Sequence, residues 1–339
     1  MRAALIGLGM VAGTYGDAIR NSGSVSLASV YARNRAAREA FLADWPDLGA
    51  TAAESIEQIA GDPQVDFVIL ATPPNARAEI VEMMIAAGKP VLMEKPVERS
   101  LAAATELVER CEAAGLPLGI MLQHRARPAA TQLAGLAADL GALLAVEINV
   151  PWWRPQSYYD APGRGSFARD GGGVMISQAI HTLDLAISIA GPVAEVAAMS
   201  ATTGFHDMEA EDFVSAGLRF ENGAIGQLFA STASFPGRGE TITFHHRAGS
   251  AHLEAGTVRV DRQDGTSRMI GQAAKSGAGA NPMDFTSDWH RFVIEDFAAA
   301  LAEGRAPLVP GRAALDVHRL IAALEISART GMRASLKDL

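Results

Sequence analysis

The pattern of hydrophobic and polar positions changes character about one third of the way along the chain. Up to about residue 121, short apolar runs alternate with segments in which apolar residues recur at helical spacing. Apolar runs without polar interruption are typical of parallel strands that are buried on both faces. The strands expected from these runs are Arg2–Ile6, Val25–Tyr31, Val65–Ala71, Val91–Met93 and Pro117–Leu122. Helices are expected at Ala78–Ala87 and Leu101–Ala114, and a glycine follows each of them.

The rest of the chain predicts longer strands and a few helices. The expected strands are Leu143–Val150, Val193–Ala201, Asp212–Phe220, Ala224–Ser231, Thr241–Arg247 and Thr257–Asp261. Asn222-Gly223 lies between two of these strands and is a strong signal for a hairpin. Helices are expected at about 173–189, 288–303 and 313–330, and the glycine-rich stretch Ser276–Ala280 predicts a loop.

These two patterns predict an α/β fold with two domains. Repeated strand–helix units in residues 1–121 are typical of a doubly wound parallel sheet. Residues 122–339 predict a second α/β domain with a large open, mostly antiparallel sheet that binds the substrate and forms oligomers. The helices at the C-terminal end are free to pack back on the first domain.

Composition places the chain among globular proteins and excludes several classes of partner. Of its 339 residues, 49% are hydrophobic and 20% are charged. The net charge of -9, without any concentration of basic residues, argues against nucleic acid as a partner. Cys111 is the only cysteine, which excludes a disulfide within the chain and a cysteine metal cluster. No apolar run reaches the length of a membrane span, and the N-terminal run lacks a signal-peptide cleavage pattern, so a cytoplasmic protein is expected.

A glycine turn follows the first expected strand. The sequence there is Leu5-Ile6-Gly7-Leu8-Gly9-Met10-Val11-Ala12. Gly7 permits the tight turn, Gly9 lets the backbone approach a pyrophosphate, and Ala12 keeps the next helix close to the strand. The N-terminus of that helix points at the phosphates. Because the motif lies between a strand and a helix, it predicts a dinucleotide site that includes Met10 and Val11.

Lys95 lies at the end of the fourth expected strand, within Met93-Glu94-Lys95-Pro96. Doubly wound sheets bind their ligands outside the carboxyl ends of the strands. Pro96 restricts the backbone of Lys95 to extended conformations. A reactive cation beside a dinucleotide site favours redox chemistry over simple nucleotide binding. The alternative interpretation is a surface lysine that is paired with Glu94.

Several segments together resemble those of a known family. They are the glycine turn, Ala71-Thr72-Pro73-Pro74-Asn75, Gly88-Lys89-Pro90-Val91-Leu92-Met93-Glu94-Lys95-Pro96, Gly172-Gly173 followed by His181 and Asp184, and Asp296-Phe297. Over nearly the whole chain the sequence is similar to the Gfo/Idh/MocA-type sugar and inositol oxidoreductases. The resemblance implies a Rossmann domain followed by an α/β domain with an open sheet. It also implies NAD(P)-dependent hydride transfer at a carbinol or carbonyl carbon of a sugar, a sugar derivative or a cyclic polyol.

Lys95 and His181 are the candidate catalytic residues. A polyol that loses a hydride must also lose a hydroxyl proton, so the enzyme needs a base and a group that holds the developing oxyanion. At helical spacing Ser177, His181 and Asp184 share a face, so Asp184 is expected to fix the tautomer of His181. Taken alone, His181 is typical of a core histidine, but it falls on the family's proposed catalytic histidine. Inositol dehydrogenases have an aspartate where this chain has Ser177, which indicates a different substrate.

Arg125 and His124 follow the last strand of the first domain. Arg125 and Pro128 match a pattern that the family has at this point. Arg125 is expected to hold the substrate or to position the hinge between the domains, and His124 to donate to a substrate hydroxyl. The alternative is that either side chain simply pairs on a loop surface.

The segment 151–160 is expected to contact a sugar ring. It holds two of the four tryptophans and two of the four tyrosines, and its candidate contacts are Trp152, Trp153, Arg154, Tyr158 and Tyr159. Aromatic faces stack on the apolar surface of sugar rings, and the polar groups bind hydroxyls. Arg164 follows and is expected to close over the site. The alternative for the aromatic residues is a subunit interface.

The end of the second expected strand bears on the choice between NAD and NADP. An acidic residue there would bind the ribose hydroxyls, but this chain has Ala32. Arg33, Arg35 and Arg38 can receive the extra phosphate of NADP, although Arg33 can equally stack on adenine in an NAD enzyme. NADP is therefore favoured over NAD. The other residues expected to contact the cofactor are Asn34, Thr72, Pro73, Asn75, Glu94 and Lys95.

Two other functions compete with sugar oxidation or reduction. One is the reduction of an imine or a double bond by the same fold, and the other is a regulator that senses a dinucleotide without catalysis. The presence of both Lys95 and His181 favours carbinol chemistry. No metal site is expected, because His245 and His246 are neighbours that point apart on a strand. A homodimer or homotetramer through the open sheet is expected.

Overall fold

The computed structural model describes residues 1–274 and 277–339, and the chain divides into two compact units. Unit 1 consists of Met1–Gln123 and Ser287–Leu315, and unit 2 consists of His124–Thr286 and Asp316–Leu339. A single cut near residue 121 does not describe this division, because Ser287–Leu315 returns to the first unit.

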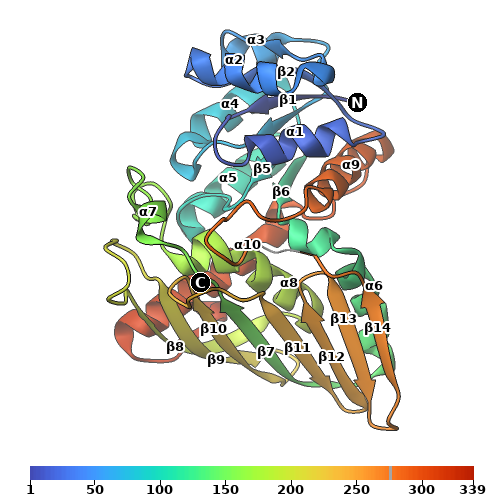
Figure 1. The fold of residues 1–339 in the computed structure, drawn as a ribbon, viewed down its shortest axis with the longest axis vertical. Coiled ribbons are helices and arrows are strands. Elements are labelled where there is room, and N and C mark those ends of the chain that lie inside the picture. The colour runs from blue at the N-terminus through green and yellow to red at the C-terminus, as the bar shows by residue number, and fades with distance from the viewer. Residues whose placement is uncertain (275–276) are drawn as a thin grey trace. The chain divides into compact units, whose positions relative to one another are not determined.

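Unit 1 is built on a six-stranded sheet in the order β3-β2-β1-β4-β5-β6 (Figure 1). All neighbouring strands are parallel, as the sequence predicted. The strands are β1 Arg2–Ile6, β2 Ser26–Tyr31, β3 Thr51–Ala52, β4 Phe67–Leu70, β5 Val91–Glu94 and β6 Leu118–Met121. The strand order reverses between β1 and β4, and doubly wound sheets bind ligands at the carboxyl edge of such a point.

The helices of unit 1 include one that comes from the C-terminal part of the chain. They are α1 Ala12–Arg20, α2 Arg35–Asp44, α3 Ile56–Gly61, α4 Ala78–Ala87, α5 Leu101–Ala113 and α9 Asp288–Glu303. The expected bounds of α4 and α9 are confirmed, and α4 ends where Gly88 adopts a φ of 65°. α9 packs against α1, and its Phe297 ring packs on Phe67 of β4. The segment Ser287–Leu315 is therefore part of unit 1.

Unit 2 contains a nine-stranded sheet in the order β14-β13-β12-β11-β7-β10-β9-β8-β15 (Figure 1). β7 and β10 are parallel, and all other neighbouring strands are antiparallel. The strands are β7 Leu143–Pro151, β8 Val193–Ala201, β9 Phe213–Phe220, β10 Ile225–Ser231, β11 Thr241–His246, β12 Gly249–Glu254, β13 Thr257–Arg262, β14 Ser267–Gly271 and β15 Ala334–Ser335. The mostly antiparallel sheet is confirmed, whereas β12, β14 and β15 were not expected.

One face of this sheet is covered and the other is open. α6 Pro128–Asp139 and α8 Ile180–Ala190 pack against strands of the sheet, and α7 Gln156–Tyr159 is a short helix that follows β7. Along β9, buried residues alternate with half-buried or exposed ones, which is typical of a strand with one solvated face. On the open face Met199, Ile225 and Met269 are 72%, 58% and 61% exposed.

Three further features complete the fold. The helix expected at about 173–189 is a π-helical segment, Met175–Ala179, followed by α8. α10 Gly311–Thr330 begins in unit 1 and continues in unit 2. Gly277–Ala280 forms no helix or strand, and Ser276, the first residue of the expected loop, lies outside the described residues. Among the residues described, no helix combines the length and apolar character that a membrane crossing requires.

Candidate functional site

The glycine turn links the end of β1 to the start of α1. Gly7 has a φ of 104°, and a side chain there would place its Cβ 2.7 Å from the backbone of Ala71. Gly7 is thus required by close packing of the first turn on the turn after β4. By contrast, within the described part of the chain no atom beyond the adjoining residues lies within 4 Å of the position of a Cβ at Gly9. The open space at Gly9, together with the N-terminus of α1 that follows it, fits a dinucleotide pyrophosphate. Met10 is half exposed beside it, Val11 caps α1 and Ala12 is buried at its first turn.

Replacing Gly9 with valine should weaken dinucleotide binding by a hundredfold or more, about 2.7 kcal/mol, without lowering the melting temperature of the free protein. The added methyl groups would enter the open space and keep a pyrophosphate from the backbone, and none of the residues that the structure describes, apart from the chain neighbours of Gly9, lies within 4 Å of the new Cβ. Calorimetric titration and thermal unfolding check this result. Gly7→Val is the matched control, because it should destabilise the protein itself. Unchanged cofactor affinity in Gly9→Val would contradict the assignment of the turn.

The turns after β4 and β5 are tied together by Arg77, a residue that the sequence analysis missed. Its buried guanidinium donates to the backbone oxygens of Thr72, Glu94 and Pro96. Burial lowers the pKa of Arg77 to about 10. Thr72 is half-buried, and Pro73 and Asn75 are exposed at the same edge of the sheet. This edge therefore offers side chains to a ligand while its backbone is held in place.

Lys95 directly follows β5 and is half-buried. The Glu94 carboxylate accepts hydrogen bonds from the Tyr15 hydroxyl at 2.9 Å and from the Lys95 backbone nitrogen at 3.1 Å. Burial raises the pKa of Glu94, and the nearby Lys95 charge acts against this shift. Burial and the Lys95 charge also lower the pKa of His290 to about 3, so His290 is neutral at ordinary pH. Lys95 thus lies next to buried polar groups of unit 1 whose pKa values its charge lowers.

The arginines after β2 differ in availability. Arg38 donates to Ala32 O and to Glu54, and Arg35 pairs with Glu39. Arg33 is exposed, and among the described residues no hydrogen bond or ion pair engages it. The Asn34 side chain accepts from Ala36 N and caps α2. Of the three arginines considered for the NADP phosphate, Arg33 is the one left available.

In unit 2, the pair Gly172-Gly173 lets the backbone approach Glu211 closely. This contact fixes the start of the helical segment 175–190 that contains His181, called the histidine helix below. A Cβ at Gly173 would lie 1.7 Å from Glu211 O, so any side chain there is excluded. The Glu211 carboxylate accepts from the backbone of Gly173 and Met175. α-Helical spacing begins only at Ile180, after the π-helical segment that contains Ser177. The common face expected for Ser177 and His181 rested on α-helical spacing, which does not apply before Ile180.

Asp184 and Arg125 form an ion pair that the sequence analysis did not foresee. Arg125 Nε donates to Asp184 Oδ2 at 2.7 Å, and Arg125 Nη2 donates to Oδ1 at 2.5 Å. Asp184 is fully buried, which raises its pKa, while Arg125 acts to lower it. Arg125 therefore binds Asp184 in the structure, and both residues lie in unit 2 with His181. The role of Asp184 in orienting His181 stays a prediction.

His181 lies beside His124. Their ring centroids are 5.1 Å apart, and the rings are tilted by 34°. Both side chains are largely buried, at 8% and 3% exposure. The sequence nominated both histidines but gave no reason to bring them together.

Two residues of the segment 151–160, called the aromatic segment below, form buried hydrogen bonds within unit 2. Trp152 is 5% exposed, and its Nε1 donates to Glu240 at 3.2 Å. The buried Arg154 guanidinium donates to the backbone oxygens of Trp153, Gly277 and Gly279. These contacts hold the segment in place, so the structure does not favour ring stacking of a sugar on Trp152.

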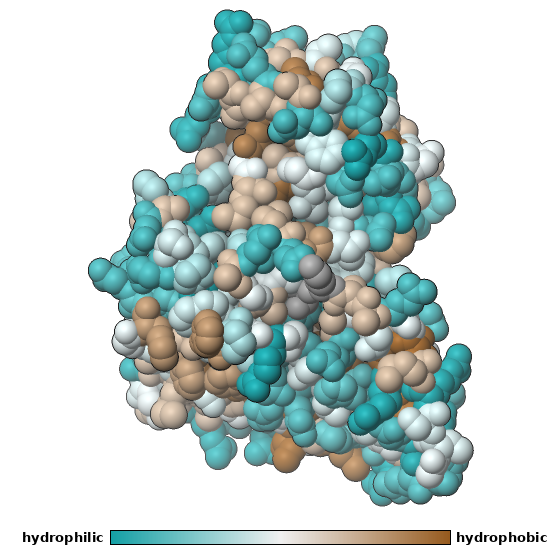
Figure 2. All heavy atoms as spheres, in the orientation of Figure 1, coloured by the Kyte–Doolittle hydropathy of each residue, from teal (hydrophilic) through white to brown (hydrophobic). Residues whose placement is uncertain are grey.

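Trp153 is the partly exposed tryptophan of the segment. Its ring meets those of Phe205 and Phe235 edge to face, at 6.0 and 5.4 Å. Phe205 and Phe235 are themselves 63% and 75% exposed. Figure 2 shows hydrophobic side chains gathered on the side of unit 2 where β8 is drawn in Figure 1. An exposed aromatic surface suits either a sugar ring or a second subunit.

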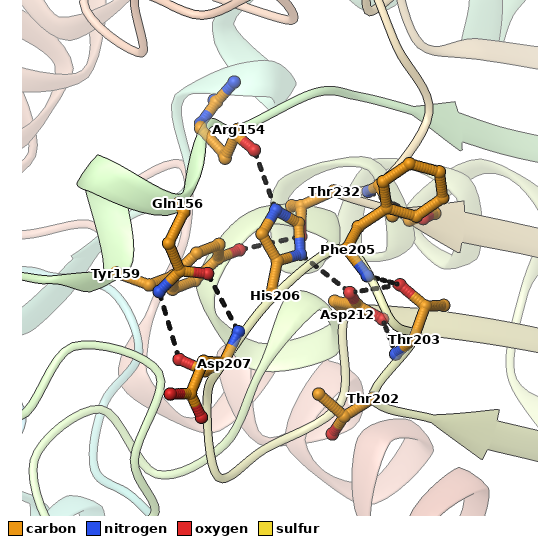
Figure 3. A network of polar contacts seen from close by, with 12 residues as sticks. Arg154, Gln156, Tyr159, Thr202, Thr203, Phe205, His206, Asp207, Asp212 and Thr232 are labelled. Atoms are coloured by element: carbon orange, nitrogen blue, oxygen red, sulfur yellow. Dashed lines mark hydrogen bonds and ion pairs between the residues drawn. The ribbon is translucent and has the colours of Figure 1, made fainter.

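A buried network joins residues 151–160 to the residue before β9 and the residue after β10 (Figure 3). His206 Nε2 donates to Arg154 O at 2.8 Å, and His206 Nδ1 lies 2.7 Å from Asp212 Oδ2. The Tyr159 hydroxyl bonds to the Thr232 hydroxyl, and its ring packs on His206. His206 and Asp212 were not anticipated, because no local motif marks them. Tyr159 therefore serves this network rather than a ligand.

Tyr158 is the tyrosine of the pair that faces other candidate residues. Its hydroxyl accepts from Gln178 Nε2 at 3.4 Å, and the Arg164 guanidinium stacks on its ring at 4.8 Å. Gln178 belongs to the π-helical segment that precedes His181. Tyr158 and Arg164 thus lie next to the histidine helix, which is consistent with their expected role.

In the described part of the chain no group of three or more metal-binding side chains is found.

Comparison with known proteins places this geometry in a family. The profile described as "Oxidoreductase family, NAD-binding Rossmann fold" matches residues 1–121, and the profile "GFO/IDH/MocA C-terminal domain" matches residues 136–252. The chain is 27% identical to D-apiose dehydrogenase from Paraburkholderia graminis over 351 residues, which covers 100% of this chain and 90% of that protein.

Two further relatives are similar over almost their full length. D-xylose 1-dehydrogenase (NADP(+)) 2 from Haloferax volcanii is 27% identical, with coverage of 91% of this chain and 92% of the relative. The crystal structure of the WlbA dehydrogenase from Bordetella pertussis, in complex with NADH and UDP-GlcNAcA, has a TM-score of 0.81 at 28% identity and covers 99% of this chain and 98% of that one. The glycine turn, the lysine after β5 and the histidine helix thus belong to an NAD(P)-dependent oxidoreductase of the Gfo/Idh/MocA family.

Proposed function

We propose that this oxidoreductase transfers a hydride between a nicotinamide dinucleotide and a carbinol or carbonyl carbon of a sugar, a sugar derivative or a cyclic polyol. The observation that carries the proposal is the position of Lys95, which is half-buried at the carboxyl end of β5. β5 pairs with β4, and β4 pairs with β1, the strand that the glycine turn follows. Sugar dehydrogenases among the relatives support the class of substrate.

In this reaction the cofactor and the side chains have separate roles. When bound, the nicotinamide ring accepts or supplies the hydride. Lys95 holds the substrate oxygen and stabilises negative charge that develops on it. His181 takes up or returns the hydroxyl proton. Gly7, Gly9 and the start of α1 would hold the dinucleotide, and Tyr158, Trp153 and Arg164 would contact the sugar.

The test is a panel of aldoses, inositols and sugar acids, each assayed with NAD and NADP in the oxidising direction. The corresponding ketoses and lactones are assayed with the reduced cofactors. Nicotinamide absorbance gives turnover directly. Sustained turnover on members of one sugar class supports the proposal. Turnover on imines or activated double bonds, with none on any sugar, would replace it by the reductase alternative.

We further propose that NADP is preferred over NAD, by about tenfold in affinity or roughly 1.4 kcal/mol. Ala32 supplies no carboxylate for the ribose hydroxyls, and Arg33 is exposed and available for a phosphate. Arg33→Ala should therefore bring the ratio of the two dissociation constants close to one. Arg35→Ala is the matched control and should leave the ratio unchanged, because Arg35 pairs with Glu39. A ratio that favours NAD in the unaltered protein would overturn this preference.

The proposal includes a cytoplasmic homodimer or homotetramer that pairs through the open face of the unit 2 sheet. The exposed Met199, Ile225 and Met269 on that face support it, since large apolar side chains in contact with water favour association. Light scattering of the purified protein gives the subunit number.

A further inference from the structure

Unit 2 contains a buried charged strut, Glu240–Arg127, that ends on His124. Both charged side chains are 0% exposed, and Arg127 Nη2 donates to Glu240 Oε1 at 2.5 Å. The second carboxylate oxygen accepts from Trp152 Nε1, and Arg127 Nη1 donates to Ala255 O at 2.9 Å. Neither charged residue is part of the proposed chemistry. A desolvated charge pair is costly to bury and calls for a reason.

The same Nη2 group also lies 2.5 Å from His124 Nε2. A guanidinium has only donors, so His124 Nε2 must accept with its lone pair. The two N–H bonds of Nη2 then serve one acceptor each, Glu240 and His124. A proton on His124 Nε2 would face another N–H in a place without water. The proton of the neutral His124 ring must therefore lie on Nδ1.

A guanidinium stays protonated in proteins, so Arg127 is a cationic donor. Burial lowers the pKa of Arg127, and the Glu240 carboxylate opposes that shift. Among the described residues, the titratable groups near His124 include His181 on α8, and the next residue, Arg125, is paired with Asp184. This ion pair contributes one charge of each sign.

The consequence concerns His181, whose ring lies 5.1 Å from that of His124. Two ordinary histidines at this distance would compete for one proton, because a charge on either ring disfavours a charge on the other. A neighbour that cannot be protonated at Nε2 removes this competition. It also presents an Nδ1–H donor at every pH at which the fold persists.

We propose that Arg127 is a positioning residue that locks His124 as the neutral Nδ1–H tautomer, so that of the two adjacent rings His181 alone takes up a proton near neutral pH. The second clause rests on the proposed function, in which His181 carries the substrate proton. The first clause is independent of it.

Nuclear magnetic resonance of the full-length protein with ¹⁵N-labelled histidine tests the lock. Long-range ¹H–¹⁵N spectra distinguish the two neutral tautomers and the imidazolium, and spectra are recorded over about pH 5 to 8, where ordinary histidines titrate. His124 is assigned as the signal that is lost in His124→Gln. The expected result is an Nδ1–H ring that does not change across the range. An Nε2–H tautomer, or a titration of His124, would overturn the proposal whatever the enzyme's activity.

A double variant, Arg127→Met with Glu240→Gln, tests the cause. It removes both charges together, so no unpaired carboxylate stays buried, and the amide oxygen of the introduced glutamine can still accept from Trp152. His124 should then be able to take up a proton, at a pKa that its burial and the neighbouring His181 keep below the ordinary histidine value. The acid limb of the pH profile of kcat/KM should steepen from one ionisation to two. The single variant Arg127→Lys, with Glu240 unchanged, keeps a cationic donor at this position. Its acid limb should therefore show one ionisation, as in the unaltered protein.

A purely structural role for Arg127 would lower the amount of folded enzyme without changing the tautomer or the shape of the profile, and that outcome would refute the positioning role. If the double variant does not fold, the spectra of the unaltered protein still decide the first clause. A locked His124 together with full turnover in His181→Gln would leave the lock standing and reject His181 as the proton carrier.

Discussion

Replacing Lys95 with methionine should lower turnover by about a hundredfold or more, the usual scale for a lost acid–base group. The affinity for a nicotinamide dinucleotide should stay similar, because the glycine turn is untouched. Methionine keeps most of the volume of lysine and removes the charge that would stabilise the developing oxyanion. Turnover is measured by nicotinamide absorbance on the best substrate of the panel, and cofactor affinity by calorimetry.

Lys89 offers a matched control at the opposite end of β5. It precedes the amino end of β5, and its Nζ donates to the backbone oxygens of Asp62 and Val65. Lys89→Met removes the same charge from the opposite end of the strand and should leave turnover per folded molecule unchanged. If Lys95→Met and His181→Gln both keep near-normal turnover on a genuine substrate, the catalytic assignment is wrong.

Replacing Arg125 with methionine should lower the free energy of unfolding by about 3 kcal/mol or more at neutral pH. Asp184 is fully buried, and Arg125 binds both of its carboxylate oxygens. Without Arg125 the carboxylate must either stay charged in a place without water or take up a proton. Urea unfolding followed by circular dichroism measures the loss. The double variant Arg125→Met, Asp184→Asn should recover much of it, because no charge is left unpaired.

The same variant should be least impaired at acidic pH. Burial already raises the folded-state pKa of Asp184, and loss of Arg125 removes the influence that lowers it. A carboxyl group with a raised folded-state pKa contributes stability that is present below its unfolded-state pKa and is lost as the pH rises through the folded-state value. The deficit of Arg125→Met should therefore shrink as the pH is lowered from 7 towards 4. A deficit that grows on acidification would show that Asp184 is not the group responsible.

Local patterns predicted the elements whose sequence matches their environment. The uninterrupted apolar runs of β1 and β4 are buried on both faces, and α4 ends at the glycine that its pattern indicated. β12, β14 and β15 escaped notice, because their sequences have weak strand preference and depend on pairing with neighbours. The parallel pairing of β7 with β10 is likewise not encoded in either strand alone.

In the candidate site, too, the sequence predicted residues that belong to short motifs and missed contacts between residues far apart in the chain. The glycine turn and Lys95 are marked by short motifs whose chemistry depends on adjacent residues. The pairs Arg125–Asp184 and Arg127–Glu240 join residues that are 59 and 113 positions apart, and no local pattern predicts such partners. Trp152 was assigned to a sugar site from its chemistry alone, and the structure places it inside unit 2. Burial of a large aromatic residue depends on the tertiary fold, which a single segment does not contain.

Unit 1 is made of two stretches of chain with the whole of His124–Thr286 between them. Phe297 fills the space over Gly119, and Ile120 N donates to Val309 O, so the late stretch covers β6. During synthesis the nucleotide-binding strands leave the ribosome long before this cover exists. The nascent chain must therefore hold an unfinished apolar surface until Ser287–Leu315 has been translated. A message cut short before codon 287 yields a first half that lacks part of its own interior.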